Sequence, residues 1–150
     1  MIINSPCKGT VKDLKYLNDS VFSKYMMGVG FFVETKDKDI VSPVDGKISY
    51  IAETKHAILI ENDDVNIMIH VGLDTCALKG SPFKIFVKEG ETIKAGQKLM
   101  EVDHKKITKN NLNSDVIVVL VENNDTSLLD NLIDYADAKT VVISNQWNIK

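Results

Sequence analysis

Two of the chain's three histidines stand beside strongly apolar segments. His56 comes directly before the apolar run Ala57 to Ile60. His70 comes directly after the run Ile67 to Ile69 and is followed by Val71. A single histidine in such a place is most often a half-buried side chain with a backbone hydrogen-bond partner. Two histidines on separate strands can, however, become neighbours in a sheet. The pair is therefore a candidate site for metal binding or for chemistry carried by the imidazole nitrogens.

A metal centre would need a third and usually a fourth ligand besides the two imidazoles. Asp74 or Cys76 could supply one, but the sequence contains no HxH or HExxH pattern. We therefore expect no dedicated metal site and no cofactor, with adventitious zinc at His56 and His70 as the alternative. The patterns GxSxG and GxxxxGK[ST] are also absent, which argues against a serine hydrolase and a P-loop enzyme. The third histidine, His104, is interpreted as a solvated turn residue.

The composition is that of a soluble globular chain. Of its 150 residues, 44% are apolar and 26% charged, and the formal net charge is −3. This negative balance disfavours a nucleic-acid partner. No apolar run approaches the length of a membrane span and residues 1–6 carry no signal-peptide pattern, so we expect a cytoplasmic protein that is not embedded in a membrane. Cys7 and Cys76 are expected to be reduced, partly buried thiols.

Short segments rich in Val, Ile and Phe recur along the chain between turn residues, which is typical of β-strands. The turns contain Gly, Asn and Asp, which tolerate the backbone angles of tight turns. Helical spacing is limited to residues 104–110 and 127–135. We therefore expect one all-β domain over residues 1–150, an antiparallel β-sandwich or flattened barrel. The strands expected most clearly are residues 30–33, 47–51, 57–60, 66–71, 98–102, 116–121 and 140–144.

Two stretches of the sequence have close counterparts further along, which indicates an internal duplication. The stretch Ser5-Pro6-Cys7-Lys8-Gly9 is similar to Ser42-Pro43-Val44-Asp45-Gly46, and residues 31–37 are similar to residues 58–64. Each copy reads as turn, strand, loop, strand and acidic turn. A duplicated hairpin motif is expected where each half has an apolar face that the other half covers.

Several motifs in the first two-thirds of the chain resemble those of one family. They are Ser42-Pro43-Val44-Asp45-Gly46, Thr54-Lys55-His56-Ala57, His70-Val71-Gly72-Leu73-Asp74-Thr75 and Leu78-Lys79-Gly80. In this order and spacing, over residues 3–103, they resemble the glucose-type IIA proteins of the bacterial phosphoenolpyruvate-dependent sugar phosphotransferase system. The resemblance implies a cytoplasmic antiparallel β-sandwich that serves as a phosphotransferase component and carries phosphate on histidine.

The resemblance implies a separate role for each histidine. His70, at the start of the family's H-x-G-x-D-T motif, would accept the phosphoryl group on Nε2 while its Nδ1 is held by the carbonyl of Gly72. His56, in the T-x-H-A motif, would be the partner imidazole, oriented by Thr54. Imidazole suits this task because it is neutral and available as a nucleophile near pH 7. A second imidazole can donate a hydrogen bond to the phosphoryl oxygens during transfer.

The resemblance also implies the partners. The carrier protein HPr would donate the phosphoryl group, the IIB domain of a membrane sugar permease would accept it, and the chain would be a monomer. Residues around the histidines would exclude water and dock HPr, with Asp19 and Asp74 meeting its basic groups. The other positions expected on this docking surface are Val21, Phe22, Met27, Met68, Val71 and Cys76.

Two other functions fit parts of the sequence. A regulatory protein could keep this fold and bind other proteins according to its phosphorylation state, without a role in sugar transport. A zinc hydrolase on a related scaffold would need the missing HxH pattern. Onward phosphoryl transfer distinguishes the first alternative, and a metal assay distinguishes the second.

Overall fold

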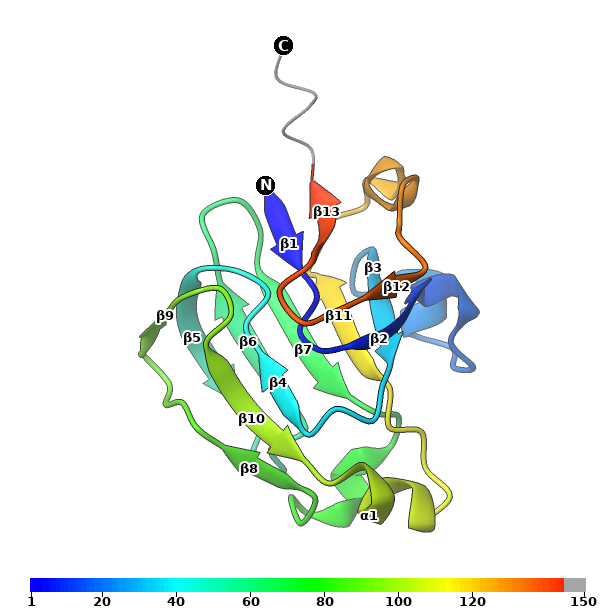
Figure 1. The fold of residues 1–150 in the computed structure, drawn as a ribbon, viewed down its shortest axis with the longest axis vertical. Coiled ribbons are helices and arrows are strands. Elements are labelled where there is room, and N and C mark those ends of the chain that lie inside the picture. Colours follow the sequence, from blue (N-terminus) through cyan, green and yellow to red (C-terminus); the bar gives the residue numbers. More distant parts are fainter. Residues whose placement is uncertain (145–150) are drawn as a thin grey trace.

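The computed structural model describes residues 1–144, which fold into short β-strands joined by turns, with one short α-helix and several 3-10 helices (Figure 1). The strands are β1 (Ile2–Asn4), β2 (Gly9–Asp13), β3 (Gly30–Glu34), β4 (Asp39–Val41), β5 (Gly46–Ile51), β6 (Ala57–Glu61), β7 (Ile67–Val71), β8 (Phe83–Ile85), β9 (Thr92–Ile93), β10 (Lys98–Val102), β11 (Val116–Leu120), β12 (Tyr135–Ala136) and β13 (Val141–Ser144). The helices are η1 (Leu14–Tyr16), η2 (Phe22–Lys24), η3 (Thr75–Leu78), α1 (His104–Lys109) and η4 (Thr126–Leu129).

The described strands form two main antiparallel sheets. Eight strands lie in the order β12-β2-β3-β11-β7-β6-β5-β9, and three lie in the order β4-β10-β8, while β1 pairs with β13. The smaller sheet lies over the β5–β7 part of the larger one (Figure 1), and the main apolar core contains residues of both sheets. The antiparallel, mostly β fold expected from the sequence is therefore confirmed. None of the helices within residues 1–144 is long and apolar enough to cross a membrane.

Side chains of the central strands alternate between two apolar clusters, one on each face of the large sheet. On β7, Ile67, Ile69 and Val71 enter the main core, whereas Met68 enters the smaller cluster. This alternation places His70 on the same face as Met68, because successive residues of a strand point to opposite faces. It also holds the strand register, since a slip by one residue would exchange the two faces. The smaller cluster contains Leu14, Leu17, Phe22, Phe32, Met68, Ile117 and Val119.

The two predicted helical segments have different outcomes. The first is confirmed, because α1 covers most of residues 104–110. The second is wrong: η4 ends at Leu129, and residues 135–136 form β12. Pairing of β12 with β2 at the edge of the large sheet takes the place of a longer helix there, and tertiary pairing commonly overrides a weak helical preference.

The interpretation of His104 as a solvated turn residue is also wrong. His104 is the first residue of α1 and is buried, with 9% of its surface exposed. Its Nε2 lies 2.6 Å from the carbonyl oxygen of Asp37 and donates to it. The physical reason is helical spacing: Ile107 of α1 is packed in the core, and a residue three positions earlier lies on the same face.

The two similar Ser-Pro stretches adopt matching hydrogen bonds. The hydroxyl of Ser5 donates to the Cys7 carbonyl and that of Ser42 to the Val44 carbonyl, each at 2.6 Å. The stretches also pair with one another, since the Asn4 amide donates to the Pro43 carbonyl and the Val41 amide to the Pro6 carbonyl. These contacts agree with a duplicated hairpin motif, which stays a prediction. The expected domain of residues 1–150 also stays a prediction, and residues 145–150 lie outside the described residues.

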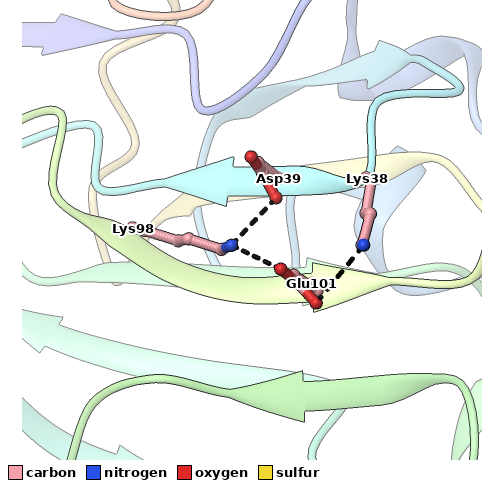
Figure 2. A network of polar contacts seen from close by, with 4 residues as sticks. All are labelled: Lys38, Asp39, Lys98 and Glu101. Atoms are coloured by element: carbon pink, nitrogen blue, oxygen red, sulfur yellow. Dashed lines mark hydrogen bonds and ion pairs between the residues drawn. The ribbon is translucent and has the colours of Figure 1, made fainter.

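Charged side chains join β4 to β10 on the outer side of the smaller sheet. Figure 2 shows Lys98 between Asp39 and Glu101, with Lys38 on the other side of Glu101. The Lys98–Asp39 distance is 3.2 Å and the Lys38–Glu101 distance is 3.7 Å. Surface pairs of this kind contribute less than about 1 kcal/mol each, so they support the pairing of these strands and the core provides most of the stability.

We expect Ser42→Ala to lower the free energy of unfolding by about 1–3 kcal/mol, because it leaves the Val44 carbonyl without its buried donor. Ser42 has no exposed surface. Ser49→Ala is the matched control, since the Ser49 hydroxyl makes a longer, exposed bond of 3.3 Å to the Leu59 carbonyl. Urea denaturation measures both variants. Equal losses in the two would contradict the structural role of the Ser-Pro turns.

Candidate functional site

Strand pairing brings the two histidines together. His70 lies near the end of β7, directly opposite Ala57 of β6, and His56 immediately precedes Ala57. The Val71 amide donates to the His56 carbonyl at 2.8 Å, which fixes the start of β6 against the end of β7. The two imidazole rings are edge to face, with centroids 4.8 Å apart and an interplanar angle of 85°. The structure therefore places the predicted pair side by side.

The protonation pattern of His70 follows from its contact with Gly72. Nδ1 of His70 lies 2.9 Å from the Gly72 carbonyl oxygen. A carbonyl can only accept a hydrogen bond, so Nδ1 carries the proton and Nε2 carries the lone pair of the neutral ring.

Gly72 can make this contact because it is a glycine. Its backbone has a φ of +77°, in the region that L side chains rarely adopt. A Cβ at this position would lie 2.3 Å from the Asn113 carbonyl oxygen and 2.4 Å from a methyl carbon of Thr75. The Thr75 hydroxyl also donates to the Val71 carbonyl at 2.5 Å. The turn after β7 is therefore packed tightly around the Gly72 carbonyl.

The second imidazole is held by a side chain. Nδ1 of His56 lies 2.6 Å from the hydroxyl oxygen of Thr54. A hydroxyl can donate or accept, so this contact orients the ring and is compatible with either tautomer. If the hydroxyl donates to Nδ1, the proton of a neutral His56 ring lies on Nε2. Thr54 and His56 thus lie together as the sequence predicts.

Burial keeps both rings neutral. It lowers the pKa of His70 from 6.5 to about 4, with a smaller contribution from the neighbouring His56. Burial also lowers the pKa of His56. The Phe22 ring shields part of the His70 ring from solvent, since the two ring centroids are 5.0 Å apart. Desolvation disfavours the charged imidazolium, so the Nε2 lone pair of His70 is available at neutral pH.

Both histidines line a pocket of about 490 Å³ that lies between the η1–η2 segment and the turn after β7. Asp19 and Asp74 bring two carboxylates to it. The Asp19 carboxylate accepts from the amides of three residues of the same turn, Val21 to Ser23. Asp74 has a φ of +61°, and within residues 1–144 its carboxylate makes no hydrogen bond or ion pair. The lining residues are Asn18, Asp19, Ser20, Val21, Phe22, His56, His70, Leu73, Asp74, Thr75 and Cys76.

Most of the predicted docking positions line this pocket, but three do not. Met27 is exposed but does not line the pocket, and its carbonyl accepts from the Glu122 amide. Met68 is buried in the smaller cluster. The expectation that Val71 takes part in docking is wrong, because its exposed fraction is 0% and strand alternation turns it into the main core. Four further lining residues were not predicted from the sequence, namely Asn18, Ser20, Leu73 and Thr75, and the last two fall within the H-x-G-x-D-T motif.

The cysteines differ in exposure, whereas both were expected to be partly buried. Cys7 is completely buried, and burial raises the pKa of its thiol to about 12, so it stays protonated. Cys76 is exposed at the pocket. Within the part of the chain that the structure describes, no group of three or more His, Cys, Asp or Glu side chains is placed to hold a metal ion.

Comparisons with known proteins agree on one family. Residues 1–126 match the model of the "phosphoenolpyruvate-dependent sugar phosphotransferase system, EIIA 1". The chain is 41% identical over 106 residues to a glucose-specific EIIA component of Mycoplasma capricolum, covering 70% of this chain and 69% of that protein. It is 37% identical over 122 residues to the glucose-specific EIIA component of Oceanobacillus iheyensis, covering 81% and 73% respectively.

A larger relative and a solved structure extend this similarity. A beta-glucoside-specific EIIBCA component of Bacillus subtilis is 45% identical over 107 residues, which are 71% of this chain but only 18% of that protein's length. The solved structure of glucose permease IIA from Mycoplasma capricolum has a TM-score of 0.85 and 33% identity, covering 95% of this chain and 94% of that one.

We expect the free energy of unfolding to fall as the pH is lowered from about 6.5 to 4. In this window the unfolded chain protonates His70 while the folded chain keeps it neutral, so the unfolded state binds more protons and gains stability. The contribution is on the order of 2–3 kcal/mol. His70→Gln should flatten the dependence in urea denaturation across this range. Identical slopes for the two proteins would show that His70 is not held neutral.

Proposed function

The chain belongs to the EIIA 1 family of the phosphoenolpyruvate-dependent sugar phosphotransferase system, and we propose that within this system His70 is the residue that carries the phosphoryl group. The phosphorylated carrier protein HPr is the donor, and the IIB domain of a membrane sugar permease is the acceptor. The chain acts as a monomer in the cytoplasm.

One observation carries this proposal: His70 has a proton fixed on Nδ1 and a lone pair on Nε2, in a neutral ring beside a second imidazole. A nucleophile for phosphoryl transfer needs that lone pair before the donor arrives. Since the Gly72 carbonyl holds the tautomer without adding a charge, no proton has to move before attack.

The reaction is a transfer of one phosphoryl group between two proteins. Nε2 of His70 attacks phosphorus, the new P–Nε2 bond forms, and the bond between phosphorus and the donor breaks with its electron pair leaving on the donor. Nδ1 keeps its proton, so the phosphorylated ring stays hydrogen-bonded to the Gly72 carbonyl. The reverse sequence at the same nitrogen passes the group to the permease domain.

His56 assists by donating a hydrogen bond from Nε2 to the phosphoryl oxygens. This requires the Thr54 hydroxyl to donate to Nδ1 of His56, which the 2.6 Å contact permits. Charge develops on the phosphoryl oxygens as the group moves, and a fixed donor stabilises it. Thr54 is therefore a positioning residue for His56.

The surroundings suit a carrier whose phosphohistidine must not meet water. Phe22 packs over the His70 ring and has only 8% of its surface exposed. Val21, which is exposed at the rim of the pocket, offers apolar surface to a partner. Asp19 and Asp74 add negative charge that attracts a basic partner surface.

His70→Ala should not become phosphorylated by phosphoenolpyruvate in the presence of Enzyme I and HPr, because it lacks the accepting nitrogen. His104→Gln is the control, because it removes a histidine outside the pocket and its amide can still donate to the Asp37 carbonyl. We expect it to be labelled as the wild type is. Intact-protein mass spectrometry measures the added phosphate, and a labelled His70→Ala would disprove the assignment.

His56→Gln should still accept phosphate, because the His70 nucleophile remains, but should pass it on more slowly. We expect the rate of onward transfer to a IIB domain to fall on the order of a hundredfold, the scale of a lost catalytic hydrogen bond. Rapid-quench measurement of phosphate loss from the labelled protein tests this. Wild-type onward transfer in His56→Gln would remove His56 from the mechanism. Failure of the wild-type protein itself to transfer would favour a purely regulatory role.

A further inference from the structure

The peptide group between Gly72 and Leu73 is bonded at both ends. Its carbonyl accepts from Nδ1 of His70 at 2.9 Å, and its N–H donates to the Asn113 carbonyl at 3.2 Å. In a trans peptide these two groups point in opposite directions. The rigid plane of this peptide is therefore held by one hydrogen bond from His70 on one side and one to Asn113 on the other. Hydrogen bonds in such a chain also polarise one another.

A second bond fixes the preceding peptide. The Gly72 amide donates to the Asp115 carbonyl at 2.7 Å. The segment 113–115 thus accepts from two successive amides of the turn that follows β7. The absence of a side chain at Gly72 allows this approach, because a Cβ there would overlap the Asn113 carbonyl.

The segment 113–115 is itself held by side chains. Oδ1 of Asn113 accepts from the Asp115 amide at 2.8 Å, and Nδ2 of Asn113 donates to the Asp115 carboxylate at 2.9 Å. Asp115 is partly buried, and burial raises the pKa of its carboxyl. The contacts between Asn113 and Asp115 close the turn, and the carbonyls of these two residues accept from the amides of Leu73 and Gly72 respectively. None of the side-chain atoms involved reaches the pocket.

We propose that Asn113 and Asp115 are positioning residues that act through the Gly72–Leu73 peptide to keep the proton of His70 on Nδ1. The inference rests on the proposed function, in which Nε2 of His70 is the accepting atom. Without the hydrogen bonds that close the turn at residues 113–115, the Gly72–Leu73 peptide plane can rotate. The hydrogen bond from Nδ1 of His70 to the Gly72 carbonyl is then weaker, and the proton is less strongly confined to Nδ1.

The test compares Asn113→Ala and Asp115→Ala with the wild type. Asn62→Ala is the matched control, because Asn62 closes a turn of the same kind at the far end of the β6–β7 hairpin, accepting from the Asp64 amide at 2.9 Å. Asp115→Asn is the conservative variant, since its amide oxygen can still accept from Asn113. Nitrogen-15 NMR of the imidazole rings reports which nitrogen of His70 carries the proton, independently of any transfer reaction.

We expect Asn113→Ala and Asp115→Ala to raise the population of His70 with its proton on Nε2. The rate constant of phosphorylation by phospho-HPr should fall on the order of tenfold at unchanged KM for the donor, the scale of a lost outer hydrogen bond. Asn62→Ala and Asp115→Asn should behave as the wild type. Wild-type tautomer populations in either folded alanine variant would overturn the proposal. Failure of the wild type to be phosphorylated would instead overturn the proposed function, because the tautomer measurement does not depend on transfer.

Discussion

The hydrogen bond from Nδ1 of His70 to the Gly72 carbonyl decides what the site can do. It places the one proton of the neutral ring on the nitrogen that faces the protein, and so leaves a lone pair on the other. Burial acts in the same direction, because it lowers the pKa of the ring and keeps it uncharged at neutral pH. Tautomer and charge are therefore both set in the free protein, and under the proposed function attack on phosphorus would need no preceding proton transfer.

This bond depends on the architecture of the large sheet. Alternation along β7 directs Ile69 and Val71 into the main core and leaves His70 on the opposite face. The strand then ends in a turn whose positive φ requires glycine. Pairing of β7 with β6 supplies the second imidazole, and pairing with β11 brings the segment before Val116 against the turn. A change in the register of either pair would separate the groups that make the site.

Most of the longer strands and the histidine pair could be predicted from the sequence, because short apolar runs between turn residues and a specific set of motifs both leave local signals. The direction of each side chain could not. β7 is apolar on both faces, so the run from Ile67 to Val71 has no alternation of apolar and polar residues, and Val71 was expected at a surface that only its neighbours reach. The helix α1 could be predicted, but the burial of His104 could not, because a helix of six residues does not show in its sequence which face packs on the core. The contacts of residues 113–115 with Gly72 join distant segments and have no local signal.

The charges around the pocket favour a carrier over a tight phosphate-binding site. Within the described residues, the lining contains two carboxylates, Asp19 and Asp74, and no Lys or Arg. A phosphoryl group on His70 would meet neutral donors and nearby negative charge, with no cation to neutralise it. Three backbone amides donate to the Asp19 carboxylate and fix its position, so its negative charge is a fixed feature of the pocket wall. Repulsion of this kind raises the free energy of the phosphorylated form, and a group held only by its covalent bond and by hydrogen bonds is easier to pass on. In the proposed function the same carboxylates would attract the basic surface of a partner, so one charge pattern would serve both docking and release.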